Sequence, residues 1–395
     1  MNQNLDKTGG PVVGGNGLLR NLNHRAVYEE LARGGPSSRS DLARKLELSP
    51  ASVGRVAETL IRAGLVEQGE RVAAAIGRPQ TLLRVNSAAG LVAGASIRSR
   101  RIRLHLADLD GQVVARAARD RRDDSASGLA DQLREMIVSA RDEHAPGVKL
   151  ASLVVGISGV WSEVERRAYA PPHLAILDGE DVKALFEDAL TGELEKGALE
   201  VDNDVNLAAL GEWEHGAARG VDDFFYLSLG SGVGGSALVG GTLHRGTLGW
   251  AGEVGYLPVF ADGEVVALER VIGRRALEEY AAKAGVRPPE GEVFAYLARR
   301  PAADAHVGRL VSDVLGQALV AVVVTLNPRM IVLGGGVGRY SSSWLQRIRE
   351  KLEESVPVAP RVVSTELGRE ASLLGAVGLG RTIARDSLLR RALVT

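Results

Sequence analysis

The sequence predicts an α/β protein with an N-terminal winged helix-turn-helix followed by a two-lobed α/β body. Three short helical patterns with a tight second turn, and then two strands, fill residues 20–86. A strand–turn–strand pattern at 91–117 recurs at 224–239, which indicates an internal duplication into two lobes. The predicted parts are a flexible arm at 1–19, the winged helix-turn-helix at 20–86, a first lobe at 87–204 and a second lobe at 205–395, whose C-terminal helix packs back on the first lobe.

The composition is typical of a globular protein and excludes some kinds of site. Of the 395 residues, 45% are hydrophobic and 25% charged, which is ordinary for a globular chain. The absence of cysteine excludes disulfides and thiolate metal ligands. No apolar run reaches the ~20 residues of a membrane helix, and the N-terminus lacks the pattern of a signal peptide. We therefore expect a cytoplasmic protein with no membrane partner.

The net charge of −1 hides an asymmetry along the chain. Residues 1–86 carry 12 Lys+Arg and 8 Asp+Glu, a balance of +4, and the remainder carries 36 and 41, a balance of −5. A basic N-terminal part on an acidic body indicates that a polyanion binds the N-terminal part alone.

Capping residues define the helices of the N-terminal part. Ser38 is suited to cap a short second helix, and Ser49-Pro50 begins a third helix with a serine cap and a proline in the first turn. Gly64 ends that helix, and a basic loop from Gly69 to Gln80 joins the two strands that follow. The buried stripe of the third helix consists of Val53, Val56, Ala57, Leu60 and Ile61.

The second helix of a helix-turn-helix enters the major groove of DNA with its N-terminal outward residues. This geometry nominates Ser49, Ala51, Ser52 and Arg55 as DNA-binding residues. Arg78, in the rigid Gly77-Arg78-Pro79 loop, is a candidate for the minor groove. The alternative is a small helical domain that binds protein, with an ordinary solvated arginine.

The body alternates strands and helices, so its ligands are expected beside strand ends. A nearly all-apolar strand at 150–157 suits a sheet buried on both faces. A later strand at 198–201 delivers Asp202-Asn203-Asp204 to its C-terminal end. The other strands are expected at 91–96, 102–108, 112–117 and 330–333, and the helices at 129–143, 181–189, 205–217, 267–282, 292–299, 305–325, 344–355 and 371–384.

The stretch 227–256 is exceptionally rich in glycine. A strand runs directly into Gly230-Ser231-Gly232-Val233-Gly234-Gly235, a turn in which several backbone N–H groups can face one ligand. Polar Glu253 and Tyr256 follow. The alternative is a tight hairpin with a bulge, but the density of glycine favours a binding site.

Four motifs in this order resemble the ROK family of repressors, open reading frames and kinases, which share the sugar-kinase and actin-like fold. The resemblance covers about residues 20–385, including the DNA-binding part of the repressor branch. The motifs are Val201-Asp202-Asn203-Asp204-Val205-Asn206, Gly230-Ser231-Gly232-Val233-Gly234-Gly235, Gly249-Trp250-Ala251-Gly252-Glu253-Val254-Gly255-Tyr256, and Asn327-Pro328-Arg329 through Gly336.

The resemblance implies roles for particular residues. In the kinases, the aspartate matching Asp204 is the general base for the sugar hydroxyl, and the residues matching Asn203 and Glu253 hold other hydroxyls. Glu269 matches a further sugar-contacting glutamate. The turn that contains Gly230, Ser231, Gly232 and Gly234 cradles the phosphates of ATP in the kinases.

The chain departs from the kinase pattern at three places. The kinases begin the domain with an Asp-x-Gly-Gly-Thr phosphate loop, whereas this chain reads Ala93-Gly94-Ala95-Ser96-Ile97-Arg98, and Ile97 and Arg98 are expected to crowd the site. Tyr256 stands where the family's zinc site has a histidine, so no metal is expected. Ser158 replaces a proline.

These departures make Asp204 a sugar ligand and a vestigial catalytic residue, and the glycine turn a vestigial nucleotide loop. The alternative for Asp202 and Asp204 is a pair of helix N-caps. Tyr256 joins Asn203, Asp204, Glu253 and Glu269 as a candidate sugar-binding residue. No cofactor is expected.

The leading hypothesis is a sugar-responsive transcriptional regulator, specifically a repressor, with a kinase-like, non-catalytic effector domain. Its partners would be double-stranded operator DNA, a monosaccharide or sugar-phosphate effector, and further copies of the chain in a homodimer or homotetramer. The alternatives are an active ATP-dependent sugar kinase with an appended DNA-binding domain, and an architectural DNA binder that senses nothing.

Overall fold

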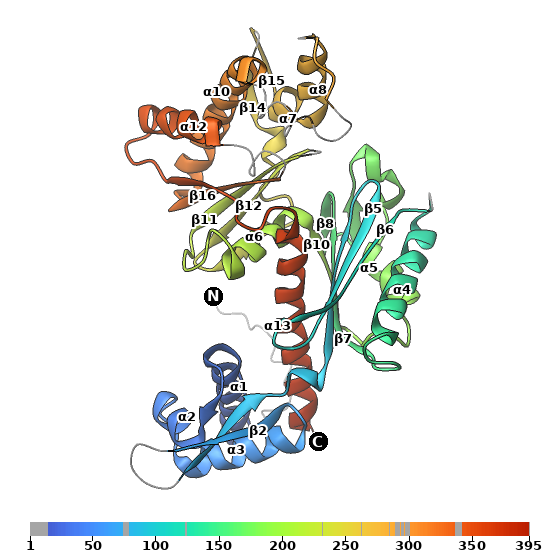
Figure 1. Ribbon diagram of the computed structural model, residues 1–395, viewed down its shortest axis with the longest axis vertical. Helices are drawn as coiled ribbons and strands as arrows, with labels where there is room; N and C mark the ends of the chain where they lie inside the picture. Colours follow the sequence, from blue (N-terminus) through green and yellow to red (C-terminus); the bar gives the residue numbers. More distant parts are fainter. Residues whose placement is uncertain are drawn as a thin grey trace, which may run out of the picture. The chain divides into compact units, whose positions relative to one another are not determined.

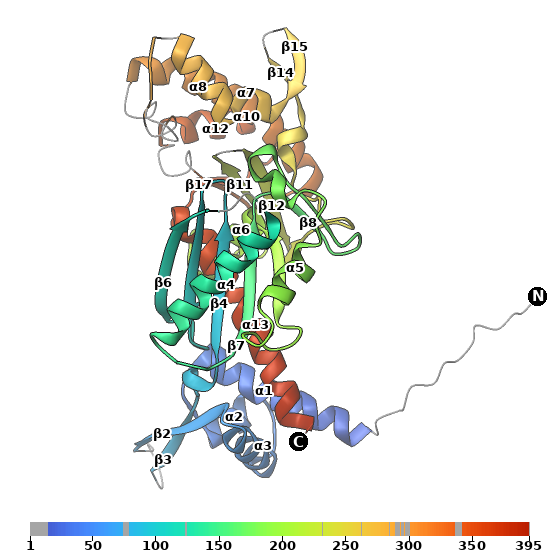
Figure 2. The same ribbon diagram turned by 90° about the vertical axis from the view of Figure 1, so that its right-hand side faces the viewer.

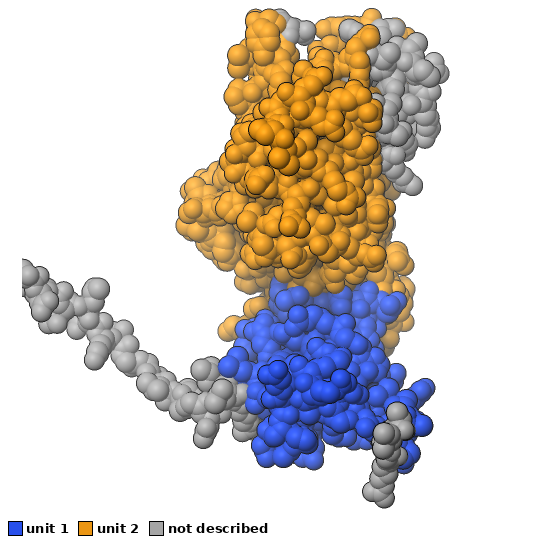
Figure 3. Space-filling model, turned by 90° about the vertical axis from the view of Figure 1, so that its left-hand side faces the viewer, with its two compact units in different colours: residues 1–91, 107–112, 381–395 blue, residues 92–106, 113–380 orange. Residues whose placement is uncertain are grey.

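The computed structural model divides into two compact units (Figure 3). The first unit contains residues 1–91, 107–112 and 381–395, and the second contains 92–106 and 113–380. The residues that the structure describes are 15–73, 79–122, 125–230, 232–261, 263–283, 285–288, 293, 296, 301–335 and 342–394.

The first unit is built from three helices and a small antiparallel sheet (Figure 1). Its elements are α1 (Gly15–Gly34), β1 (Ser37–Ser38), α2 (Arg39–Lys45), α3 (Pro50–Arg62), β2 (Val66–Val72) and β3 (Gln80–Val85), with sheet order β1-β3-β2. Both predicted caps are confirmed, because Ser38 accepts from the backbone N–H of Asp41 and Ser49 accepts from that of Ser52. Helix–turn–helix followed by a β-hairpin is the winged arrangement.

The core of the first unit includes residues from the far end of the chain. Leu389, which is 5% exposed, packs in one cluster with Val27, Tyr28, Leu60 and Leu83. It belongs to α13 (Ala371–Val394), a helix that was predicted to end at 384. That prediction was wrong because the last turns are stabilised by tertiary packing, which local sequence does not reveal.

Two arginines of α13 also hold the hairpin turn at 107–112 within the first unit. Arg385 donates to the carbonyl of Leu109 at 2.6 Å, and Arg381 donates to the same oxygen at 3.3 Å. Arg25 of α1 forms a 3.3 Å ion pair with Asp386. The winged helix therefore shares its core and its polar contacts with two segments that are distant in sequence.

The second unit begins with a mixed five-stranded sheet in the order β10-β7-β4-β5-β6. Its helices α4 (Ala126–Asp142) and α5 (Val182–Ala189) contact each other and flank the sheet (Figure 2). A short hairpin, β8 (Val160–Ser162) and β9 (Arg167–Tyr169), was not predicted. The strands are β4 (Leu91–Ile97), β5 (Arg101–Ala107), β6 (Val113–Asp120), β7 (Leu150–Ile157) and β10 (Leu199–Asn203).

A second five-stranded sheet, in the order β13-β12-β11-β16-β17, follows helix α6 (Asp204–His215). Its strands are β11 (Phe224–Leu229), β12 (Val233–Val239), β13 (Thr242–His244), β16 (Met330–Gly334) and β17 (Arg361–Ser364). β11 pairs antiparallel with β12 and parallel with β16. The chain thus has two mixed sheets of similar layout, in agreement with the predicted α/β fold.

The helices beside the second sheet differ from the prediction at one place. The hairpin β14 (Pro258–Ala261) and β15 (Glu264–Ala267) was not predicted, and the helix predicted at 267–282 is divided into α7 (Leu268–Ile272) and α8 (Arg274–Lys283). The break lies at Gly273, the C-cap of α7, whose backbone is extended (φ −65°, ψ 161°). α10 (Pro301–Leu326) and α12 (Ser342–Ser355) complete the layer, and the helix predicted at 292–299 lies outside the described residues apart from 293 and 296.

Among the described helices, one passes a length and hydropathy test for crossing a membrane. It is the stretch Arg309–Leu326 of α10, half of which is buried. Val314, Leu315 and Leu319 of this stretch belong to the core beneath the second sheet. Core helices pass the same test, so the finding is weak evidence for a membrane span.

Within the second unit, α6 and residues 371–380 of α13 cross at a contact made of glycines. A side chain at Gly375 would overlap the carbonyl oxygen of Leu207 and lie 2.7 Å from the backbone nitrogen of Gly211. Residues 371–380 also pack on the first sheet, because Gly94 of β4 lies against the backbone of Leu373 and Ser152 of β7 donates to the carbonyl of Gly380 at 2.7 Å. The start of α6 is thus positioned by helix packing as well as by β10.

Candidate functional site

The predicted polar cluster lies where β10 passes into α6. β10 pairs parallel with β7, with Asn203 opposite Ile157, so both strands end at one edge of the sheet. Asn203 caps α6 by accepting from the backbone N–H of Val205 at 2.8 Å. The alternative that Asp202 and Asp204 form a capping pair is therefore wrong: the asparagine between them is the cap.

Asp202 is a buried structural residue. One carboxylate oxygen accepts from the N–H of Asn203 at 2.8 Å and from the side chain of Asn206 at 2.7 Å. The other accepts from two nitrogens of Arg245 at 2.9 and 2.7 Å. These contacts occupy both oxygens, and the residue is 4% exposed, so Asp202 is saturated by protein donors.

Asp204 forms an ion pair with Arg98, which directly follows β4. The distance from Nη2 of Arg98 to Oδ2 of Asp204 is 2.9 Å. The side chain of Asp204 is 10% exposed and that of Arg98 is 52% exposed. Ile97, by contrast, is fully buried in β4. Of the two residues expected to crowd this site, Arg98 is the one whose side chain reaches Asp204.

Glu253 joins the cluster from the second half of the glycine-rich stretch. Its Oε1 accepts from Nδ2 of Asn203 at 3.2 Å. Burial, and then the charges of Glu269 and Asp204, raise the pKa of Glu253 to about 7. A carboxyl group with this pKa exchanges a proton near neutrality, and it is a donor when protonated and an acceptor when ionised.

Glu269 supports the glycine turn. Its Oε2 accepts from the N–H of Val233 at 3.0 Å, and a side chain at Gly232 would lie 3.1 Å from the same oxygen. Gly230 has open space around its Cα, and Ser231 lies outside the described residues. Gly234 lies against Val205 of α6, at 3.2 Å for an added Cβ.

Much of the glycine density in 227–256 serves close packing of the backbone. Gly235 donates to the carbonyl of Gly252 at 2.7 Å, and neither residue has room for a side chain. A side chain at Gly249 would lie 2.5 Å from the carbonyl of Trp161, and one at Gly255 would lie 2.5 Å from that of Val233. Gly230 and Gly240, by contrast, have nothing within 4 Å of an added Cβ.

Tyr256 is 70% exposed and packs on Trp250, with ring centroids 6.1 Å apart. Trp250 in turn contacts Tyr169 of the β8–β9 hairpin at 5.2 Å. The structure thus brings Asn203, Asp204, Glu253 and Glu269 into one electrostatic cluster and places Tyr256 in an aromatic group. In the described ranges, no set of three or more His, Asp and Glu side chains is arranged to hold a metal ion.

Two further residues of the site, Arg245 and His173, were not singled out from the sequence. Arg245 orders Asp202, and His173 lies within electrostatic reach of Asp204 and Glu269. Burial and then the charge of Arg274 lower the pKa of His173. Neither residue belongs to a recognisable local motif, because each comes from a loop that only the fold brings to the sheet edge.

The raised pKa of Glu253 predicts a pH-dependent stability. In the unfolded chain this carboxyl titrates near 4.5, and in the folded chain near 7, so the folded state binds the proton more tightly between these values. The stabilisation is full below pH 4.5 and is lost as the pH rises through 7. We expect the free energy of unfolding to fall by on the order of 2 kcal/mol between pH 5 and pH 8 from this group.

Urea unfolding across this pH range measures the effect. Glu253→Gln should remove this component of the pH dependence, and Glu264→Gln, at an exposed position of β15, should retain it. Parallel pH profiles for the wild type and Glu253→Gln would contradict the assignment.

Three of the predicted DNA-binding residues, Ser49, Ser52 and Arg55, form one polar row at the start of α3. Ser49 accepts from the backbone of Ser52 at 3.1 Å, their hydroxyls lie 2.8 Å apart, and Arg55 donates to the Ser52 hydroxyl at 3.4 Å. Ser49, Ala51 and Arg55 are exposed, and Ser52 is half-buried. Arg78 lies outside the described residues.

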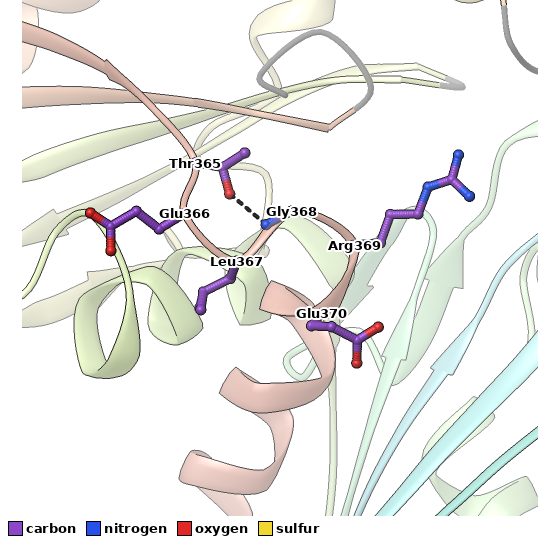
Figure 4. A pocket seen from close by; sticks show the side chains of 6 residues that line it. All are labelled: Thr365, Glu366, Leu367, Gly368, Arg369 and Glu370. Atoms are coloured by element: carbon purple, nitrogen blue, oxygen red, sulfur yellow. Dashed lines mark hydrogen bonds between the residues drawn. The ribbon is translucent and has the colours of Figure 1, made fainter. Parts of the chain in front are cut away.

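A cavity of about 320 Å³ lies at the loop between β17 and α13, and none of the predicted site residues lines it (Figure 4). The loop is fixed to α6 by Glu212, a fully buried carboxylate that accepts from the hydroxyl of Thr365 and from the N–H of Leu367. The cavity is lined by Thr365, Glu366, Leu367, Gly368, Arg369 and Glu370.

Two mixed sheets, a carboxylate–amide cluster at a strand end and a winged helix define a two-lobed sugar-kinase-like protein with an N-terminal DNA-binding fold. The chain belongs to the ROK family, whose model matches residues 92–383. The resemblance inferred from the four motifs is thereby confirmed.

Proteins similar to this chain include both a repressor and an enzyme. The chain is 23% identical to a putative xylose repressor of Caldicellulosiruptor sp., over 93% of this chain and 97% of that protein. It is 35% identical to the bifunctional enzyme NanE/NanK of Brucella melitensis over 188 residues, which are 47% of this chain and only 35% of that enzyme.

Solved structures share the fold over most of the chain. A ROK family transcriptional regulator, described as a homologue of the E. coli MLC protein, matches with a TM-score of 0.79 and 23% identity over 95% of this chain and 99% of that one. A ROK glucokinase from Streptomyces griseus, solved with glucose and AMPPNP, matches with a TM-score of 0.61 and 24% identity over 74% of this chain and 100% of that one. The match to the regulator thus extends over the winged helix as well as the body.

Proposed function

We propose that the chain is a sugar-responsive transcriptional repressor whose kinase-like body binds a monosaccharide or sugar phosphate without phosphorylating it. The observation that carries the proposal is the hydrogen-bonded row of Ser49, Ser52 and Arg55 at the start of α3, with Ser49 and Arg55 exposed, on a winged helix joined to a sugar-kinase-like body. Full-length similarity to a putative xylose repressor supports the same assignment. Such a protein would act in the cytoplasm, where operator DNA is found.

The absence of catalysis is proposed from the state of Asp204. A general base must be free to accept a proton from the sugar hydroxyl. Here Asp204 is paired with the guanidinium of Arg98 at 2.9 Å, which competes with a sugar hydroxyl for the carboxylate oxygen. The residue is therefore suited to holding a ligand in place.

Sugar binding would alter DNA affinity through the arrangement of two DNA-binding units in a homodimer or homotetramer. Half-sites must lie about 34 Å or a multiple of this distance apart, so a small rotation breaks the register. A coupling of about 1–3 kcal/mol corresponds to a 5–150-fold change in DNA affinity.

To test the proposal, the full-length protein is used to select an operator from a random duplex library. The affinity of the protein for this operator is then measured by fluorescence anisotropy, with and without sugars. We expect at least one sugar among xylose, glucose, N-acetylmannosamine and their phosphate esters to weaken operator binding. Unchanged DNA affinity, together with no heat of sugar binding, would refute the sensing function.

An active ATP-dependent sugar kinase with an appended DNA-binding domain is the second candidate. The cluster of Asn203, Asp204 and Glu253 and the similarity to glucokinases favour it. Release of ADP in the presence of a sugar, abolished by Asp204→Asn, would establish the kinase and overturn the non-catalytic assignment.

Arg55 provides a test of DNA recognition. Arg55→Ala is expected to weaken operator binding by about 1–3 kcal/mol, because a bidentate arginine–base contact discriminates by this amount. Arg62→Ala, at an exposed residue about 10 Å further along the same helix, serves as the matched control. An equal loss on operator and random DNA would mean that Arg55 contacts only phosphate.

A further inference from the structure

The sheet edge that holds Asp204 also carries a cluster of arginines. The turn between β4 and β5 contains Arg98, Arg100 and Arg101, and it is closed by a 3.1 Å hydrogen bond from the N–H of Arg98 to the carbonyl of Arg101. The N–H of Arg121, just after β6, donates to the carbonyl of Arg100 at 2.9 Å. The turn is thus fixed to the end of β6.

Two of these guanidinium groups have donors left over. An arginine offers five N–H donors, and the ion pair of Arg98 with Asp204 uses the Nη2 end of a side chain that remains 52% exposed. Nη1 of Arg121 is buried and has no hydrogen-bond partner among the described residues. Nη1 of Arg121 is closed to solvent, so Arg121 contributes its positive charge, whereas the half-exposed Arg98 offers the donors that a ligand can reach.

Charged residues on neighbouring elements also act on this edge of the sheet. His173, in the loop after β9, lies within electrostatic reach of Arg121, Arg274 and Asp204. Arg274 is paired with Glu278 at 3.0 Å on the same helix, whereas Arg121 has no such pair among the described side chains. Arg98 and Arg121 thus place two positive charges on the side of the site opposite the acidic residues Asp204, Glu253 and Glu269.

A neutral sugar makes poor use of this arrangement. To reach Asp204 with a hydroxyl, it must share the carboxylate with Arg98 and replace part of a charge-assisted hydrogen bond with a weaker neutral one. A sugar with an anionic substituent can bind the free donors of Arg98 while its hydroxyls face Asn203 and Glu253.

We propose that the effector is a sugar bearing an anionic group, a phosphate ester or a carboxylate, and that Arg98 binds this group while the charge of Arg121 adds to the attraction. The inference rests on the proposed sugar-binding function and specifies its ligand class. Arg98 is then the residue that selects the effector, since it both attracts the anion and restricts access of neutral sugars to Asp204.

Two measurements on the full-length protein test the proposal. The first is the thermal shift caused by inorganic phosphate, relative to chloride at equal ionic strength. We expect phosphate to stabilise the wild type and Arg101→Gln but not Arg98→Gln. Arg101 is a suitable control because its side chain is exposed and paired with Asp120. Equal stabilisation of Arg98→Gln would overturn the assignment of the anion site.

The second measurement is calorimetric binding of matched pairs: glucose with glucose 6-phosphate and glucuronate, xylose with xylose 5-phosphate, and N-acetylmannosamine with its 6-phosphate. We expect an anionic member to bind about 10- to 100-fold more tightly than its neutral parent, the range for hydrogen bonds to charged groups. The preference should disappear in Arg98→Gln and persist in Arg101→Gln. Comparison of glucuronate with the phosphate ester identifies which anion is recognised.

The outcomes separate this inference from the proposed function. Tighter binding of a neutral parent by the wild type overturns the anionic effector but leaves a sugar-responsive regulator. An anion preference that survives in Arg98→Gln overturns the role of Arg98. Phosphate stabilisation that depends on Arg98, without binding of any sugar in the panel, supports the anion site and counts against the sugar-sensing function.

Discussion

Replacing Gly375 with alanine is expected to lower the free energy of unfolding of the second unit by about 3 kcal/mol or more, the upper part of the range for overpacking. The new methyl group would overlap the carbonyl oxygen of Leu207 and lie 2.7 Å from the backbone nitrogen of Gly211. Both atoms belong to the backbone of α6, so no side chain can rotate away. The two helices must separate instead.

The same substitution should also weaken sugar binding. α6 begins at Asp204 and is capped by Asn203, so a displaced helix moves two of the predicted ligand residues away from β4 and Arg98. Urea unfolding and calorimetric sugar binding measure the two effects. Gly54→Ala is the matched control, because it makes the same change in a helix where nothing lies within 4 Å of the added Cβ. Gly375→Ala unfolding at the urea concentration of the wild type would contradict the predicted backbone contact.

Truncating Leu389 to alanine is expected to destabilise the DNA-binding unit by about 2–5 kcal/mol, the range for a buried leucine. Leu389 is 5% exposed and packs in the cluster formed by α1, α3 and the wing. The loss comes from removed apolar contact and from the cavity left behind. Since the recognition helix α3 depends on this core, we expect operator binding to fall with it.

Hydrogen exchange resolves this effect by unit. Amides of α3 should exchange faster in Leu389→Ala, whereas those of β7 and β10 in the second unit should keep their protection. Arg390→Ala, at the exposed neighbouring position, is the control. Unchanged exchange in α3 would show that the winged helix does not need the C-terminal helix, and an isolated fragment of residues 15–91 would then be expected to fold alone.

The sequence predicted much of the fold because local signals agreed with the tertiary structure. Ser49 and Pro50 mark the start of α3, and the structure confirms both the cap and the helix. The apolar run at 150–157 matches β7 to the residue, since a strand buried on both faces has an unbroken hydrophobic signal. The family was recognisable because four short motifs keep their order along the chain.

The sequence did not predict features that depend on contacts between distant segments. The last turns of α13 are stabilised by the core of α1 and α3, more than 300 residues away in the chain. Such contacts leave no periodic signal in either segment.

The candidate site was likewise predicted only in part from the sequence. Sequence alone nominated Asn203, Asp204, Glu253 and Glu269, because short motifs carry them. Only the tertiary structure decided that Asn203 is the helix cap, that Arg245 saturates Asp202, and that Arg98 occupies Asp204. The physical reason is that the chemical type of a side chain follows from the sequence at that position. Its partner depends instead on the fold, which brings strand and loop ends from distant parts of the chain to the same edge of a sheet.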